Sequence, residues 1–488
     1  MPAHTATDMN VESSNPTANS SLITKWWTLR LAGPIIAAAV IRLTLLAITL
    51  ARNGSSALFQ VDPGTYLEPG RNLILHGCFA VDGVPDLFRT PGYPLLLAIT
   101  SLAGFPAAAV VNVILSVFTV FLVWRLGWTV SGDNRIALGA AWIFAFEPMS
   151  VVYSVCLTSE TLFIALFLLS IERLTTFLRK RSLPVLAVAG LWLAAATFVR
   201  PITYYLPVAL AVGLSLVLAR VPGLRWKAPA VLLISVLPWL AAWQIRNWVE
   251  TGYSGFSSVT EVNLYFLNAA EVTARVEHRS FSEVSRSLGY LGGLNYGEQA
   301  YLYQPYLALH PEQTGWSQGS RLLFMRSEAY HVIRAHYGVY LQQCVIMPLL
   351  KTIINPGAGN FNHVLYPEDP GPNAGLVNEN PMRLAIRLIR EYPRAAAQRL
   401  VFEVVLLGLY LFATRGIILV ARGVYRDRIH NKCFWLLLGT SFYFVVVTGI
   451  GGGPGADARY RLPIMPAVCI LASAGAKRAK LTTSPETT

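Results

Sequence analysis

The chain of 488 residues is 54% hydrophobic and only 13% charged, and its charges lie in short segments between long apolar runs. This composition excludes a large soluble protein and indicates an integral membrane protein with many spans. The net charge of +13 would suit nucleic acid, but lysines and arginines in short loops instead set membrane topology. The five cysteines are scattered singly, which predicts neither a zinc site nor a disulfide framework.

A bilayer core of about 30 Å needs about 20 apolar residues of helix, and ten segments approach this length. They cover 29–51, 107–126, 136–153, 158–178, 184–199, 202–219, 228–245, 401–421, 433–450 and 462–475. Residues 1–24 are rich in Ser, Thr, Asn and Ala, which predicts a disordered cytoplasmic tail. We therefore predict a core module over 25–250, an outer-face region over 251–400, C-terminal spans over 401–476 and a second cytoplasmic tail over 477–488.

The basic segments set the orientation of these spans, because Lys and Arg stay on the cytoplasmic side. One arrangement places every short basic loop inside, together with Lys25 and Arg30 before the first span. The same arrangement puts these parts of the chain on the outer face: the Asp62 segment, the turn at 158–160, Arg200, residues 246–399 and residues 451–461.

Three segments are too short or too interrupted to be assigned as spans. Residues 64–75 and 93–102, in the first outer loop, predict two amphipathic helices lying at the interface. Residues 337–354 contain two glutamines, a proline and a lysine, and one extra span there would place the C-terminal basic loops outside. We expect a re-entrant or interfacial helix, or a weak span paired with 382–399, and hence ten or twelve spans in an all-α polytopic protein.

Asp62 and Glu160 are the candidate catalytic carboxylates. Asp62 follows the first span and precedes a Pro-Gly turn, so its carboxylate would lie at the membrane surface, where it can act as a general base. The alternative is an N-cap, since Asp before Pro is a typical helix start. Glu160 opens the fourth span, where an acidic residue is either functional or favoured by the helix dipole. Glu147, before Pro148, is a weaker candidate.

Five arginines come out on the outer face, against the positive-inside trend: Arg89, Arg200, Arg246, Arg459 and Arg461. Each alone can snorkel to lipid headgroups. Together they indicate an anionic ligand, and the planar fork of guanidinium suits a phosphate. The eight histidines show no metal-ligand spacing, so the sequence gives a metal site no support.

Several short motifs, taken in their order along nearly the whole chain, resemble those of a known family. The motifs are Asp62-Pro-Gly-Thr-Tyr66, Arg89-Thr-Pro-Gly-Tyr93-Pro, Leu157-Thr-Ser-Glu160, Thr197-Phe-Val-Arg200-Pro201, Trp243-Gln-Ile-Arg246-Asn247 and Arg459-Tyr-Arg461-Leu-Pro463. With them, the chain resembles the GT-C glycosyltransferases, polytopic enzymes that use a polyprenyl-phosphate sugar donor. That family includes the protein O-mannosyltransferases and the aminoarabinose transferase of lipid A.

The resemblance implies a GT-C fold and a role for each matching residue. Asp62 would be the general base, Arg89 would contact the donor phosphate, and Glu160 would position the acceptor or a metal. Tyr66 and Tyr93, in the same motifs, are implied substrate contacts, and the other four outer arginines are candidates for the same phosphate. No cofactor is certain, and a divalent metal stays open.

The implied reaction is transfer of a sugar, with inversion, from a polyprenyl-phosphate donor to a hydroxyl of a lipid, glycan or protein. The expected location is the bacterial plasma (inner) membrane, with the active site facing the periplasm or the exterior. The expected partners are the donor, the acceptor and membrane lipids, and not nucleic acid. Two alternatives stay open: a lipid-linked saccharide flippase or transporter, and an O-antigen-type polymerase or ligase. The lack of a visible internal repeat weighs against a transporter.

Overall fold

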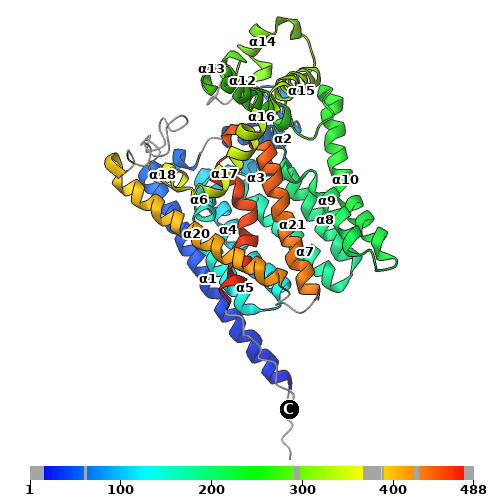
Figure 1. The fold of residues 1–488 in the computed structure, drawn as a ribbon, viewed down its shortest axis with the longest axis vertical. Helices are drawn as coiled ribbons and strands as arrows, with labels where there is room; N and C mark the ends of the chain where they lie inside the picture. Colours follow the sequence, from blue (N-terminus) through cyan, green and yellow to red (C-terminus); the bar gives the residue numbers. More distant parts are fainter. Residues whose placement is uncertain are drawn as a thin grey trace, which may run out of the picture.

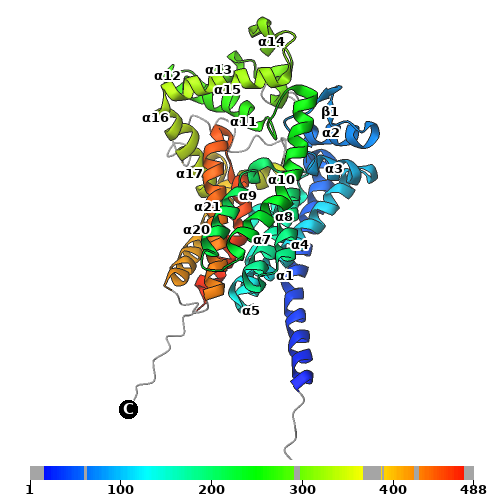
Figure 2. The same cartoon turned by 90° about the vertical axis from the view of Figure 1, so that its right-hand side faces the viewer.

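The computed structural model describes residues 16–59, 63–290, 297–366, 386, 389–422 and 428–477. They form a bundle of long helices, and a group of shorter helices covers one end of it, at the top of Figure 1 and Figure 2. The strands within these ranges are a two-residue hairpin, β1 (Ala80–Val81) with β2 (Val84–Pro85). The all-α class that the sequence predicts is confirmed.

Six described helices are long and apolar enough to cross a membrane. They are α1 (Pro16–Asn53), α4 (Phe105–Ser131), α7 (Glu160–Lys180), α10 (Leu224–Thr251), α20 (Pro393–Ala421) and α21 (Arg428–Gly451). The pair α5 (Asn134–Ala145) and α6 (Pro148–Val155), bent by 55°, makes a seventh when taken as one broken span. These seven coincide with seven of the ten predicted spans.

The other three predicted spans fall on helices of 12 to 17 residues, shorter than a straight crossing needs. Proline fits the first turn of a helix. Pro207 lies in the first turn of α9, and Pro466 in the first turn of α22. The three helices are α8 (Leu183–Val199), α9 (Leu206–Val217) and α22 (Met465–Ala476).

The break between α5 and α6 falls at Glu147 and Pro148. The Glu147 carboxylate caps α6 by accepting a hydrogen bond from the Ser150 amide. Arg42 of α1, which is fully buried, donates to the Ala145 carbonyl at 2.9 Å and to Ser150 Oγ at 3.0 Å. A buried arginine therefore satisfies a carbonyl that the broken helix leaves without a partner. Glu147, as the cap of α6, has a structural role at this break.

The first outer loop forms α2 (Pro63–His76), the β1–β2 hairpin and α3 (Gly92–Thr100). The two helices coincide with the predicted interfacial helices and pack against each other. Gly70 permits this contact, because a Cβ at that position would lie 2.2 Å from the Pro94 carbonyl oxygen.

Residues 253–290 and 297–335 form a unit that we call the cap. It contains α11 (Val259–Val262), a π-helical turn (Asn263–Ala269), α12 (Ala270–Val276), α13 (Phe281–Ser287), α14 (Tyr306–Leu309) and α15 (Gln318–Ala335). Its core includes the buried side chains of Phe266, Tyr301 and Met325, and Leu87 and Phe88 of the first outer loop join this core. The cap is therefore packed directly onto the first outer loop.

The segment 337–354 is helical throughout, as α16 (Tyr337–Tyr340), a π-helical turn (Leu341–Ile346) and α17 (Met347–Ile354). It leaves the cap and runs beside α21, and α18 (Ala358–Leu365) follows it. Residues 367–385, 387 and 388 lie outside the described residues, so the pairing of this segment with 382–399 stays a prediction.

The end of the bundle opposite the cap gathers the basic loops. Arg179 donates to the Thr129 carbonyl at 2.8 Å, and Lys477 Nζ lies 2.5 Å from the Asp133 carboxylate. The segments around 133, 179 and 477 therefore share one end of the molecule, as the predicted topology requires.

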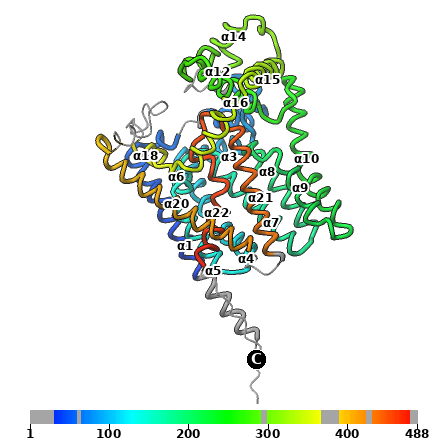
Figure 3. Tube along the Cα trace, viewed as in Figure 1, coloured from blue at the N-terminus to red at the C-terminus, as the bar shows by residue number. Residues whose placement is uncertain are grey.

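The C-terminal helices are packed tightly into the bundle. The Cα trace shows α20 crossing obliquely over α22, its main contact (Figure 3). Two glycines allow the close approach, because a Cβ on Gly416 or on Gly475 would lie 2.0 Å from a carbonyl oxygen of the facing helix.

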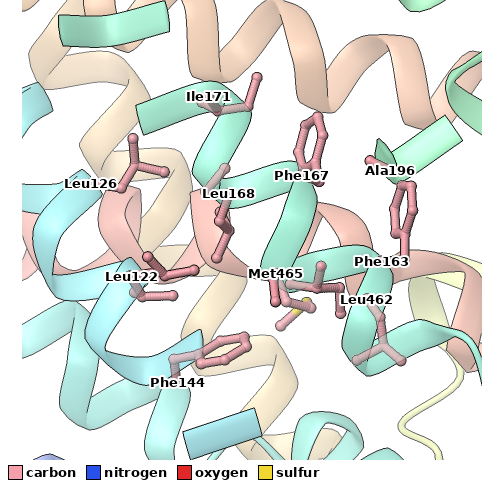
Figure 4. Close-up of a cluster of buried hydrophobic side chains, with 14 of the residues drawn as sticks. Leu122, Leu126, Phe144, Phe163, Phe167, Leu168, Ile171, Ala196, Leu462 and Met465 are labelled. Carbon is pink, nitrogen blue, oxygen red and sulfur yellow. The ribbon is translucent and has the colours of Figure 1, made fainter. Parts of the chain in front are cut away.

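The centre of the bundle is an apolar cluster that also positions the C-terminal segment. Figure 4 shows Phe163, Phe167 and Leu168 of α7 beside Leu462 and Met465. Leu462 belongs to a 3-10 helix (Ala458–Ile464), which contacts the first turns of α7. This packing places the residues around 459 beside the N-terminal end of α7.

Candidate active site

A small pocket lies where α7 begins, at the end of the bundle that faces the cap. Its charged lining consists of Glu160, Arg200 and Arg459, and the rest is apolar or aromatic. The structure thus brings together three of the predicted site residues, which come from three separate segments of the sequence.

Glu160 and Arg200 form an ion pair at the base of this pocket. Glu160 is the first residue of α7 and is 4% exposed, and the helix dipole favours a carboxylate there. Burial alone would lower the pKa of Arg200, but the Glu160 carboxylate reverses this effect, so the pKa is raised and Arg200 stays charged. The second carboxylate oxygen, Oε2, is buried and makes no hydrogen bond among the described residues.

Arg459 lines the pocket from the C-terminal segment. Asp457 caps this 3-10 helix by accepting from the Arg459 amide at 2.8 Å, and its carboxylate lies 3.8 Å from Arg459 Nε. The guanidinium lies 5.2 Å from the centre of the Tyr460 ring. The lining of the pocket therefore holds two guanidinium groups and one carboxylate, and the Asp457 carboxylate beside Arg459 offsets part of this positive charge.

A hydrogen-bond chain connects the pocket with the first outer loop. Arg200 Nη1 lies 3.4 Å from Ser159 Oγ, and that hydroxyl lies 3.3 Å from the Tyr66 hydroxyl. The Tyr66 hydroxyl in turn accepts from Arg89 Nη1 at 3.0 Å. Arg89 also lies over the Tyr66 ring, at 4.1 Å from its centre, and donates to Thr65 Oγ1 at 2.9 Å. Arg89 and Tyr66 are thus part of the same site as Arg200.

Tyr93 lies next to this series of hydrogen bonds and does not line the pocket. It is 2% exposed, and its ring packs edge to face on Tyr66 with 5.0 Å between the ring centres. Such packing fixes the Tyr66 ring and so the position of the hydroxyl that Arg89 contacts.

Asp62 lies outside the described residues, so its role as general base stays a prediction. α2 begins at the next residue, Pro63. Thr65 and Tyr66, three and four residues after Asp62 in the sequence, both contact Arg89.

Arg246 and Arg461 are not brought into the pocket. Arg246 donates to the carbonyls of Asp86 and Phe79, at 3.2 and 2.7 Å, and pairs with Glu250. Arg461 is 2% exposed, and its guanidinium binds the carbonyls of three residues, Thr352, Asn355 and Pro356. Each guanidinium holds backbone segments together, so neither is assigned to the donor phosphate.

Three residues near Arg459 are not among the predicted site residues: Tyr153, Asn360 and Asp457. Asn360 donates to the Tyr153 hydroxyl at 3.2 Å and approaches the Asp457 carboxylate at 3.5 Å. The one available signal was Asp457, two residues before Arg459, since Asp commonly caps a helix start. The contact with Asn360, 97 residues away, left no pattern in the sequence.

The described side chains do not fit a metal ion. Within the ranges given above, no group of three or more His, Cys, Asp or Glu could hold one. The excess of guanidinium in the pocket favours an anion over a divalent cation.

Asp86 is expected to make stability depend on pH. Burial raises the pKa of its carboxyl group, and hydrogen bonds from the Phe88 and Arg89 amides only partly oppose this. The folded protein therefore binds this proton more tightly than the unfolded chain, and stability falls as pH rises from about 4, the ordinary Asp value, through the raised pKa. Unfolding midpoints in detergent should fall over this window in the wild type but less in Asp86→Asn, and parallel curves would contradict the assignment.

Gly92→Ala is expected to destabilise the protein and disturb the site. A Cβ at Gly92 would lie 2.7 Å from the Phe198 carbonyl oxygen, so α3 would have to move away from the end of α8 that precedes Arg200. Such overpacking costs about 1–3 kcal/mol. Thermal unfolding should show a lower midpoint than for Gly213→Ala, where a Cβ meets nothing within 4 Å. Equal midpoints would mean that α3 and α8 tolerate separation.

No protein-family model and no curated protein sequence matches this chain. Among solved structures it is similar to the Archaeoglobus fulgidus oligosaccharyltransferase in the apo form, with 13% identity and a TM-score of 0.47 over 91% of this chain and 50% of that one. It is similar as well to the archaeal oligosaccharyltransferase AglB from Archaeoglobus fulgidus in complex with an inhibitory peptide and a dolichol-phosphate, with 12% identity and a TM-score of 0.44 over 93% of this chain and 50% of that one. The chain thus spans about half the length of that protein.

It is also similar to ArnT from Cupriavidus metallidurans bound to undecaprenyl phosphate, with 12% identity and a TM-score of 0.37 over 93% of this chain and 78% of that one. A likeness at this level assigns no residue, donor or acceptor to this chain.

Proposed function

We propose that this protein is an inverting glycosyltransferase that moves a sugar from a polyprenyl-phosphate donor to a hydroxyl acceptor, on the cap side of the membrane. One observation carries the proposal: Arg200 and Arg459 face the buried Glu160 in one pocket, and hydrogen bonds join this pocket to Arg89. Segments far apart in the sequence meet there to gather positive charge.

The positive charge suits the chemistry of the donor. A sugar linked to polyprenyl phosphate carries one negative charge on its phosphodiester, and the polyprenyl phosphate that leaves carries a second. Guanidinium groups that are already in place stabilise this charge as it forms in the transition state. In the proposal Arg200 and Arg459 bind the leaving phosphate, and Arg89 contacts it from the first outer loop.

The acceptor side of the reaction rests on the two carboxylates. Asp62 takes the proton of the acceptor hydroxyl, whose oxygen attacks the anomeric carbon from the face opposite the phosphate. The bond to the phosphate oxygen breaks as the new bond forms, and the configuration inverts. Glu160 holds Arg200, and its buried oxygen Oε2 accepts a hydrogen bond from a sugar or acceptor hydroxyl once the pocket opens.

The position of the pocket suits substrates that stay in a membrane. Phe163, Ile164 and Ile202 contribute to its apolar lining, and it lies at the end of α7 away from the basic loops. By the positive-inside rule, we place it on the periplasmic or exterior side of a bacterial plasma (inner) membrane. Both lipid-borne substrates then meet at one interface, which supplies favourable orientation.

Transfer from synthetic donors tests the proposal. The purified full chain, in vesicles, is given a panel of radiolabelled polyprenyl-phosphate sugars together with lipid and glycan acceptors. We expect donor consumption, release of polyprenyl phosphate and label in an acceptor, none of which empty vesicles show. Passage of intact lipid-linked sugar across the bilayer, without consumption, would replace the transferase by a flippase. Joining of whole lipid-linked glycans would indicate a polymerase or ligase.

A further inference from the structure

The loop that carries Arg89 is held by the cap and by the end of α10. The carbonyl oxygens of four consecutive residues, 85 to 88, each accept a hydrogen bond from residues far along the chain. The donors are Gln318 Nε2 at 3.1 Å, Arg246 Nη1 at 3.2 Å, the Ser258 amide at 2.8 Å and Ser257 Oγ at 2.7 Å. The backbone before Arg89 therefore has little freedom of its own.

Asp86 is the centre of this arrangement. Its side chain is 1% exposed, and one oxygen, Oδ1, accepts three hydrogen bonds. Two come from within the loop, from the Phe88 amide at 2.8 Å and the Arg89 amide at 3.3 Å. The third comes from Gln299 Nε2 of the cap at 3.0 Å. A buried carboxylate needs such donors, so removal of the Gln299 amide disturbs the oxygen that orients the Arg89 backbone.

The other end of Arg89 is fixed on α2. Its Nε and Nη1 donate to Thr65 and Tyr66, as described above. The side chain is therefore held between α2 and a backbone amide whose acceptor is Asp86. A shift of Asp86 changes where the guanidinium lies relative to the Tyr66 hydroxyl and the rest of the pocket.

We propose that Asp86 and Gln299 are positioning residues for Arg89, so that the cap sets the place of this guanidinium through one buried hydrogen bond. The inference rests on the proposed function for the role of Arg89 in catalysis. The structural part of it, that Gln299 orders the loop before Arg89, does not depend on any activity.

Gln299→Met tests this link, because methionine has nearly the same length and shape but donates no hydrogen bond. We expect the Phe88 and Arg89 amides to exchange hydrogen at least about tenfold faster than in the wild type. The matched control is Tyr306→Phe, which removes another buried cap hydrogen bond, from Tyr306 to Gln313 at 3.0 Å, and should leave these two amides protected. If Gln299→Met does not give folded protein, Gln299→Leu, which also lacks the amide donor, takes its place.

A double-mutant cycle on sugar transfer tests the positioning role. Gln299→Met should lower kcat/KM by about tenfold, the size expected for a hydrogen bond to a buried charge. In the Arg89→Ala background the same substitution should have no further effect, because a residue that acts through Arg89 has nothing left to position.

The outcomes separate this inference from the proposed function. Faster exchange without any sugar transfer by the wild type would uphold the cap link and overturn the transferase. Normal transfer by the wild type with unchanged exchange in Gln299→Met would overturn the link and leave the transferase standing. Independent, additive losses in the two backgrounds would show that Gln299 acts on activity by another route.

Discussion

Asp62→Asn is expected to reduce sugar transfer by a factor of about 10²–10⁴, the usual contribution of a general base. Asparagine has nearly the same size and caps a helix start as well as aspartate does, so the fold should be unaffected. The two interpretations of Asp62 in the sequence, base and cap, therefore separate in this variant. The measurement is the single-turnover rate with a donor that the wild type consumes.

Asp133→Asn is the matched control for this prediction. Asp133 caps α5 and pairs with Lys477 at the far end of the bundle, so its substitution changes a capping aspartate without approaching the pocket. Its transfer rate should equal that of the wild type. An Asp62→Asn protein that transfers at the wild-type rate would reduce Asp62 to a helix cap, and the proposed mechanism would then need another base.

Much of the fold was predictable because a bilayer imposes a simple length rule on apolar helices. All ten predicted spans fall on helices, and α2 and α3 lie where short helices were expected. The rule fails for three of these spans, since α8, α9 and α22 have only 12 to 17 residues. The cap was not predictable, because its short helices and π-helical turn leave no steady period, and its core is completed by Leu87 and Phe88 from another loop.

The sequence could predict which residues are candidates for the site, but not which of them contact one another. Excess positive charge on one face identified five arginines, and three of them do meet near Glu160 or Tyr66. The number of charges on one face could not show that Arg246 and Arg461 donate their hydrogen bonds to backbone carbonyls, because that depends on which loops end nearby. The same holds for Ser159, whose hydroxyl joins Arg200 to Tyr66 through contacts 41 and 93 residues away.

Arg459→Ala is expected to lower kcat by a factor of about 10²–10³ and to leave the protein folded. The loss has the size found when one preorganised donor to a developing charge is removed. Arg459 is 22% exposed and the nearby Asp457 carboxylate is 36% exposed, so water can solvate the carboxylate that loses its neighbour. The measurements are kcat with a saturating donor and the unfolding midpoint in detergent.

Arg200→Ala should behave differently, because Glu160 is almost fully buried. Without its partner the carboxylate becomes an uncompensated buried charge, which costs about 3–5 kcal/mol, so stability and transfer should fall together. Glu160→Gln in the Arg200→Ala background should recover much of the stability but not the activity. Arg399→Ala, which removes a half-exposed pair with Glu403 on α20, controls for the loss of an arginine and should change neither quantity.

If Arg459→Ala turns over at the wild-type rate, the pocket does not hold the leaving phosphate, and the role of Arg200 would be to keep Glu160 charged and the fold intact.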